Sequence, residues 1–94
     1  MSLPLDKLEA YKRTPVFTES SIPSGLLKQH NLATGVWGKL IVNSGQLELE
    51  FPGNKNRLRC AEPGADVWIQ PEEWHLIKKA TQVRFYIEFY REKV

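Results

Sequence analysis

Short apolar runs with a two-residue period, separated by turn residues, constrain the fold of this chain more than any other feature. From Pro15 onward, Gly, Pro and Asn recur roughly every 8–12 positions, so the runs between them are too short for typical helices. The most regular run is 83–90, where apolar residues at every second position would share one face of a strand. The pattern predicts about seven short strands and therefore an all-β sandwich or barrel.

The predicted strands cover the ranges 26–32, 36–42, 46–51, 57–60, 67–70, 74–78 and 83–90. Asn43-Ser44-Gly45 is a strong hairpin signal, so the strand before it should end there and the next should return beside it. Residues 1–15 carry at most a weak helical pattern, which Pro15 would stop, and are expected to form an extended or weakly helical arm. We expect a jelly-roll barrel, because an immunoglobulin-like sandwich is disfavoured by the missing cysteine pair.

Size and charge narrow the classes of function. A chain of 94 residues has room for one domain, so we expect a single domain over 1–94. Its 13 basic and 11 acidic residues are interspersed and give a net charge of +2, which predicts no nucleic-acid partner, because such partners usually require a clustered basic face. No apolar run approaches the ~20 residues of a membrane span, and the first residues lack the pattern of a signal peptide. We therefore expect no membrane partner.

The single cysteine, Cys60, bears on location and packing. It cannot form an internal disulfide, which fits a reducing compartment and predicts a cytoplasmic protein. Because Cys60 would share a strand face with Leu58, we expect it to be a small buried apolar residue rather than a reactive thiol.

The chain has two histidines, His30 and His75, each close to turn residues. Neutral imidazole is a common ligand of zinc, iron and nickel, and barrels gather such ligands from separate strands. Because a catalytic zinc usually takes three protein ligands, a carboxylate should complete the set, and Glu88 in the middle of a strand is the best candidate. The sequence thus suggests His30, His75 and Glu88 as metal ligands, with a divalent transition metal (zinc, iron or nickel) as cofactor. The alternative is that both histidines are satisfied polar or surface residues.

Large aromatic side chains are expected near these histidines. Trp37, Trp74 and Tyr86 are the predicted ligand-binding residues, because a large ring excludes water and carries a polar hydrogen-bonding atom. The alternative is that such rings fill the core or the interface of a homodimer. The sequence shows neither a glycine-rich phosphate loop nor a nucleophile elbow, so no residue is assigned a catalytic role.

Five separated segments carry a resemblance to a known family: 11–17, 28–31, 35–40, 71–75 and 85–90. In this order they resemble the N-terminal domain of the tellurite-resistance protein TehB and the related YeaR-like stand-alone proteins, from about residue 8 to residue 92. The resemblance implies a cupin-like double-stranded β-helix, a link to tellurite resistance, and His30 and His75 as pocket histidines. In full-length TehB the methyl transfer belongs to a C-terminal methyltransferase domain, which we do not expect in this chain.

The chain departs from the wider cupin pattern in the first metal motif. His30 is followed by Asn31-Leu32 rather than by a second histidine, and no glutamate occurs before Gly45. The second motif is closer to the pattern, with Gly64, Pro71 and His75 near the usual spacing. A four-ligand cupin metal centre is therefore not expected.

These observations predict a binding domain rather than an enzyme. We expect it to bind a metal, a small molecule or an oxyanion, to act in the response to tellurite or other toxic oxyanions, and to form a homodimer. The alternatives are a metal-dependent oxygenase or isomerase of the cupin type, or a dimerisation or interaction module.

Overall fold

The computed structural model describes residues 5–55 and 57–93. Nearly all of its regular structure is β-strand, and its two helices are single 3-10 turns. In chain order the elements are η1 (Leu5–Lys7), β1 (Leu8–Arg13), β2 (Phe17–Thr18), η2 (Ser24–Leu27), β3 (Trp37–Glu50), β4 (Leu58–Ala61), β5 (Val67–Ile69) and β6 (Leu76–Glu92). The prediction of a small all-β domain is confirmed.

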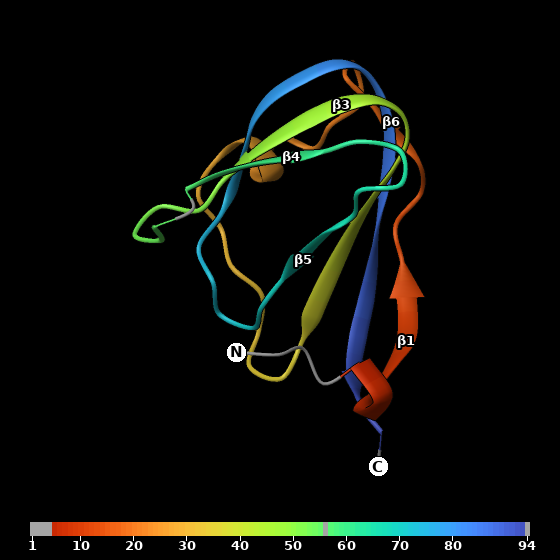
Figure 1. The fold of residues 1–94 in the computed structure, drawn as a ribbon, viewed down its shortest axis with the longest axis vertical. Coiled ribbons are helices and arrows are strands. Elements are labelled where there is room, and N and C mark those ends of the chain that lie inside the picture. The colour runs from red at the N-terminus through yellow and green to blue at the C-terminus, as the bar shows by residue number, and fades with distance from the viewer. Residues whose placement is uncertain (1–4, 56, 94) are drawn as a thin grey trace.

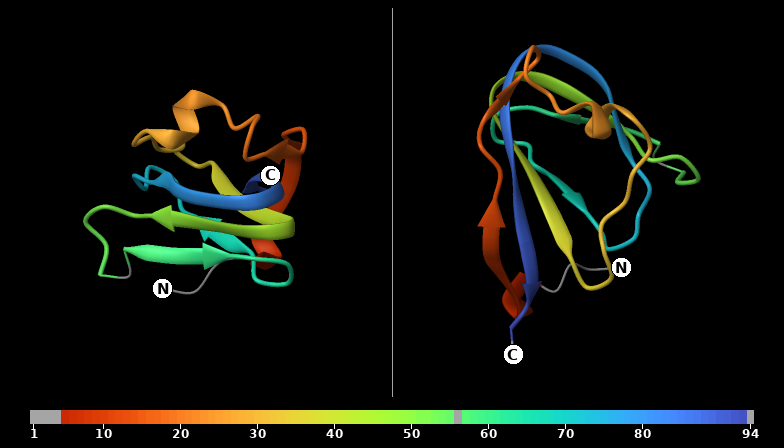
Figure 2. Two further views of the ribbon diagram at one scale, coloured as in Figure 1. Left: turned by 90° about the horizontal axis from the view of Figure 1, so that it is seen from above. Right: turned by 180° about the vertical axis from the view of Figure 1, so that it is seen from behind.

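Two long antiparallel strands, β3 and β6, form the centre of the sheet, whose order is β1-β6-β3-β4. The short strands flank different halves of this pair: β4 lies beside residues 47–50 of β3, and β5 lies beside residues 38–40. Both long strands bend between these halves, so that the upper part of the sheet folds over the lower part (Figure 1). The chain between β2 and β3 runs down the side opposite β1 (Figure 2). This arrangement encloses one core.

The bend replaces the predicted hairpin at residues 43–45. β3 continues through these residues, and its pairing with β6 shifts register on both sides of Ser44. Gly45 has a φ of 79°, and on the facing strand Gln82 has a φ of 43°. A Cβ on Gly45 would lie 2.2 Å from the carbonyl oxygen of Gln82. The turn residues therefore encode a bulge that bends a long strand, not a reversal of the chain.

Other predicted boundaries also differ from the structure. The ranges 74–78 and 83–90 merge into the single strand β6, because Gln82 adopts the left-handed conformation without ending the strand. The predicted strand at 26–32 is instead η2 followed by one isolated bridge. Within the predicted N-terminal arm, residues 8–13 form β1 and pair with β6, whereas residues 1–4 lie outside the described residues.

The core consists of the apolar residues that point between the two halves of the sheet. Its largest fully buried side chains are Phe51, Phe85, Leu40, Leu47, Leu49 and Val83. No helix in the described ranges is long and apolar enough to cross a membrane.

The prediction that Cys60 is buried is wrong. Cys60 is exposed, and Leu58 is 55% exposed. In β4 the residues that share a face with the core are Arg59, opposite Leu49, and Ala61, opposite Leu47. The hydrophobicity of Leu58 suggests that Leu58 and Cys60 point toward the core. The register of β4 with β3 decides the matter, and it turns Arg59 and Ala61 inward instead.

Candidate functional site

His30 and His75 meet at one end of the barrel. His30 lies between η2 and β3, and His75 lies directly before β6. The two residues form an antiparallel bridge in which the backbone N–H of each donates to the carbonyl of the other, both at 2.9 Å. Their ring centroids are 4.1 Å apart, and the ring planes are inclined at 62°. The fold thus brings together two imidazoles that are distant along the chain.

Both imidazoles are held in the same way by a local backbone carbonyl. Nδ1 of His30 lies 2.8 Å from the carbonyl oxygen of Lys28, and Nδ1 of His75 lies 2.7 Å from that of Glu73. A carbonyl oxygen only accepts hydrogen bonds, so each Nδ1 must carry the proton. In the neutral rings each Nε2 is then left with a free lone pair. This tautomer is the one that ligand-binding histidines commonly adopt.

His75 is the buried member of the pair. Its side chain is only 2% exposed, whereas His30 is half-buried. Burial lowers the pKa of His75; the hydrogen bond to the Glu73 carbonyl opposes this shift, and the neighbouring His30 adds to it. Nε2 of His75 has no hydrogen-bond partner among the described residues.

The aromatic ring of Phe51 lies beside His75, and polar residues surround this pair of rings. The centroid of Phe51 lies 6.0 Å from that of His75, and the Arg59 guanidinium carbon lies 4.7 Å from the Phe51 centroid. The Glu73 side chain accepts a 3.1 Å hydrogen bond from Asn54, which ties the loop after β3 to the segment before His75. His75 therefore sits against a core ring and beside the Glu73 carboxylate, whose charge opposes the lowering of the His75 pKa.

Glu88, the predicted third metal ligand, does not join the histidines. Its carboxylate accepts a hydrogen bond from the hydroxyl of Tyr90. Burial, followed by this hydrogen bond to Glu88, raises the pKa of Tyr90 to about 12. Among the described residues, no three His, Cys, Asp or Glu side chains form a group that could hold a metal ion. The predicted set of His30, His75 and Glu88 is therefore not assembled.

Two of the three predicted aromatic residues lie on the outer face of the sheet. Trp37 pairs with Tyr90, and Tyr86 pairs with Ile41, whereas the alternate residues of both strands point into the core. The Arg13 guanidinium carbon lies 5.4 Å from the Tyr86 centroid. The third, Trp74, is 51% exposed next to His75. Strand alternation separates Trp37 and Tyr86 from the histidines, because the histidine pair adjoins the core residue Phe51.

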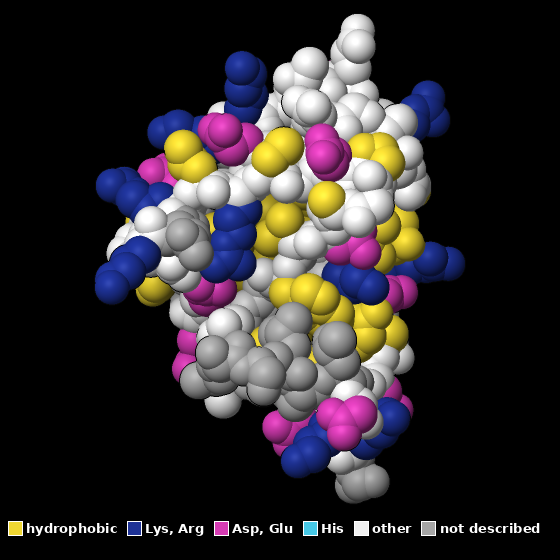
Figure 3. All heavy atoms as spheres, viewed as in Figure 1, with side chains coloured by type: hydrophobic (Ala, Val, Ile, Leu, Met, Phe, Trp, Pro, Cys, Tyr) yellow, Lys and Arg dark blue, Asp and Glu magenta, His cyan; other side chains and the backbone are white. Residues whose placement is uncertain are grey.

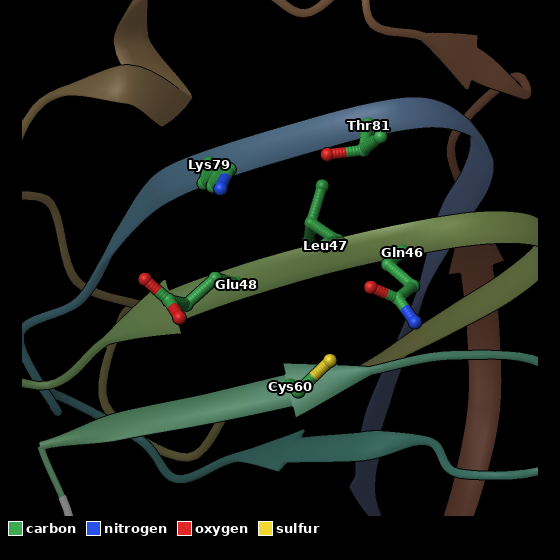
Figure 4. A pocket seen from close by; sticks show the side chains of 6 residues that line it. All are labelled: Gln46, Leu47, Glu48, Cys60, Lys79 and Thr81. Carbon is green, nitrogen blue, oxygen red and sulfur yellow. The ribbon is translucent and has the colours of Figure 1, made fainter.

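A separate hollow of about 130 Å³ lies over β3, β4 and β6 (Figure 4). The residues around it are Gln46, Leu47, Glu48, Cys60, Lys79 and Thr81. Glu48 pairs with Cys60 on one side and with Lys79 on the other, so all three share the outer face. Its polar side chains are mostly exposed, and it has no contact with the histidine pair, so we take the pair as the candidate site.

The family follows from a sequence model that matches residues 12–87 and describes a TehB-like domain. This chain belongs to the TehB-like domain family. The matched range includes both histidines, the whole of β2 to β5 and most of β6, so the family assignment covers the site as well as the fold.

Solved structures agree with this assignment. TehB from Haemophilus influenzae aligns with a TM-score of 0.83 and 26% identity over 94% of this chain, which spans about a third (32%) of that protein. A protein from Escherichia coli strain K12 aligns over 100% of this chain and 99% of its own length, with a TM-score of 0.86 and 21% identity. A cupin domain of an XRE-family transcriptional regulator from Enterobacter cloacae covers 87% of this chain and 97% of its own length, with a TM-score of 0.50 and 14% identity. The last two likenesses concern the fold alone, which is cupin-like. A comparison with curated proteins returns no match.

Sequence reasoning missed Arg59 as a neighbour of the site. The alternation of 57–60 placed Arg59 on the solvent side, whereas its pairing with Leu49 turns it inward. A cue was present: Arg59 lies two positions before Ala61, a small residue suited to a crowded inner face.

Proposed function

We propose that this domain is a non-catalytic binding module that holds a small molecule or oxyanion at the His30–His75 pair. One observation carries the proposal: the fold places the two rings 4.1 Å apart and commits both Nδ1 atoms to carbonyls, which leaves both Nε2 atoms free. A pair of histidines needed only for packing would not require two adjacent nitrogen atoms that lack hydrogen-bond partners.

A resident metal centre does not fit the donors that the described chain offers. Two imidazoles supply two nitrogen ligands, whereas a catalytic zinc takes three protein ligands and other cupin-type metals need a comparable set. Glu88, the expected third ligand, is engaged by Tyr90. We therefore derive no chemistry through zinc, iron or nickel, and a metal-dependent enzyme is not favoured.

We base the proposed physiological role on the family resemblance. The resemblance to the tellurite-resistance protein TehB supports a role in the response to tellurite or similar toxic oxyanions. The chain spans about a third of that protein (32%), so the activity of the whole protein is not transferred to this domain.

The test observes the imidazole nitrogen atoms directly. Titration of the ¹⁵N-labelled protein with tellurite, selenite, phosphate or zinc, followed by long-range ¹H–¹⁵N correlation, should move the Nε2 resonances of His30 and His75 saturably for at least one oxyanion. The variant His30→Ala should bind that oxyanion at least about 10-fold more weakly, because it removes one of two contacting groups worth about 1.4 kcal/mol or more.

The matched control is Cys60→Ser, which alters an exposed residue on the outer face of β4. It should bind like the wild type. Unmoved Nε2 resonances with every oxyanion, or equal affinity of His30→Ala and wild type, would contradict the proposal. Tight zinc binding alone would replace it with a metal-binding function.

A further inference from the structure

We infer that the ligand of the histidine pair is an anion that also carries a hydroxyl group, and that Arg59 binds its negative charge. This inference rests on the proposed function and specifies its ligand.

Arg59 is an inward-facing cation on the edge strand β4. It lies directly opposite Leu49, which is 1% exposed, and two residues before Ala61, which is 0% exposed. Side chains at these positions share one face of the sheet, so Arg59 extends toward the core side and is half-buried there. A guanidinium in this position loses part of its hydration.

No carboxylate compensates this charge. Neither an ion pair nor a hydrogen bond joins the Arg59 side chain to any other described residue, and its partner is the ring of Phe51, 4.7 Å away. By contrast, Arg57 in the preceding loop contacts Glu50 at 3.2 Å. Cation–π contact offsets only part of the cost of desolvating a guanidinium. Its planar array of N–H donors therefore remains free for a bidentate contact with an oxyanion.

Phe51 connects Arg59 with the histidines. This ring is fully buried and contacts the guanidinium of Arg59, while His75 lies 6.0 Å from it. Arg59 offers hydrogen-bond donors and Nε2 of His75 offers an acceptor, and both residues adjoin the Phe51 ring. A ligand that satisfies both has oxygen atoms that accept and a hydroxyl that donates. Hydrogen phosphate and hydrogen selenite have this chemistry.

Charges of both signs lie around the histidine pair. Glu50 is contacted by two cations, Arg57 at 3.2 Å and Lys78 at 3.6 Å, while the Glu73 carboxylate acts on His75. Along the left edge of the face shown in Figure 3, where the loop between β3 and β4 lies in Figure 1, Lys and Arg side chains alternate with Asp and Glu. The charge that distinguishes the site is therefore that of Arg59 itself, which no carboxylate contacts in the described part of the chain.

The experiment measures the affinity of phosphate, selenite and tellurite by calorimetry and by the Nε2 resonances, in wild type, Arg59→Gln, Arg59→Lys and Arg57→Gln. We expect Arg59→Gln to weaken anion binding at least about 10-fold, the size typical of a lost charge-assisted contact. Arg59→Lys, which keeps the charge but not the planar fork, should lose less. Arg57→Gln, which removes a nearby cation of the same type, should bind within about twofold of the wild type.

The outcomes separate this inference from the proposed function. If wild type binds an oxyanion, His30→Ala does not, and Arg59→Gln binds like wild type, the role of Arg59 is overturned while the histidine site stands. If Arg57→Gln and Arg59→Gln weaken anion binding equally, the role of Arg59 is also overturned, because the loss would then reflect the overall positive charge rather than a direct contact. If wild type binds none of the three anions, both fail. An unchanged His30–His75 bridge in the amide spectrum of Arg59→Lys shows that folding is not the cause of any loss.

Discussion

At the scale of single residues, the histidine pair combines a rigid backbone with an unfavourable second charge. The reciprocal 2.9 Å hydrogen bonds fix the two backbones, and the rings are only 4.1 Å apart. Two imidazolium ions at this separation would repel each other.

The lowered pKa of His75 predicts a pH-dependent stability. Burial is the main cause of the shift from the ordinary value of 6.5, so below about this pH the unfolded chain takes up a proton that the native protein does not bind. Stability is fully present above this value and falls as the pH drops toward the lower folded-state pKa. Urea unfolding of wild type and His75→Gln at pH 7.5 and 5.0 measures this change in the free energy of unfolding. Wild type should lose more stability than the variant, and equal losses would contradict the assignment.

At the scale of elements, the paired bulges in β3 and β6 let one pair of strands serve both halves of the barrel. Gly45 and Gln82 face each other at the bend, each with a positive φ. Bulges increase local twist and change the direction of a strand, which allows residues 37–42 and 47–50 to line two parts of one core. The face that points inward changes from even to odd positions across the bend: Leu40 and Val42 are buried before it, and Leu47 and Leu49 after it.

This arrangement predicts that Gly45→Ala is strongly destabilising. Its Cβ would lie 2.2 Å from the Gln82 carbonyl oxygen and 2.6 Å from that of Thr81, both backbone atoms that cannot move independently. Together with the strained φ, the cost should be at least about 3 kcal/mol.

The matched control is Gly53→Ala. Gly53 has a similar φ of 86°, but a Cβ there would meet nothing within 4 Å. Gly53→Ala should therefore lower the free energy of unfolding only by the cost of placing alanine at a positive φ, about 1 kcal/mol. Chemical denaturation of both variants gives the comparison, and similar losses at the two positions would show that close contact at the bend is unimportant.

At the scale of the whole molecule, the outer face of the lower sheet carries a second group of aromatic residues. Trp68 and Tyr90 have ring centroids 5.0 Å apart, and Trp37 and Tyr86 lie on the same face. Their charged neighbours include both signs: Lys39 contacts Asp66 at 3.6 Å, and Glu88 accepts from Tyr90. A face that is aromatic and electrically mixed suits contact with its own copy.

The homodimer expected from the sequence thus stays a prediction with a defined surface. Sedimentation equilibrium at about 100 μM should give twice the 10.9 kDa chain mass for wild type. Ile41→Glu, in the middle of this face, should be monomeric, whereas Leu58→Glu, which alters an exposed residue on β4, should remain dimeric. A monomeric wild type, or a dimer that Ile41→Glu leaves intact, would rule out this surface.

Some features of the protein follow from local sequence. Period-two alternation and frequent turn residues indicate an all-β domain, because a side-chain period of two is the geometry of a strand. The same pattern correctly assigned the inner face of 83–89, where Val83, Phe85 and Ile87 are buried. The five segments that resemble the TehB N-terminal domain likewise belong to the sequence itself.

Other features exist only in the folded chain. Whether Asn43-Ser44-Gly45 turns the chain or bends it depended on how closely β6 packs against β3, which no local pattern encodes. The inward direction of Arg59 depended on its register with Leu49, since a shift by one residue reverses every side chain of a strand. The meeting of His30 and His75, and the separation of both from Glu88, depended on which strand faces line the core. Strand pairing is non-local, so only the tertiary structure could decide which of these side chains share a site.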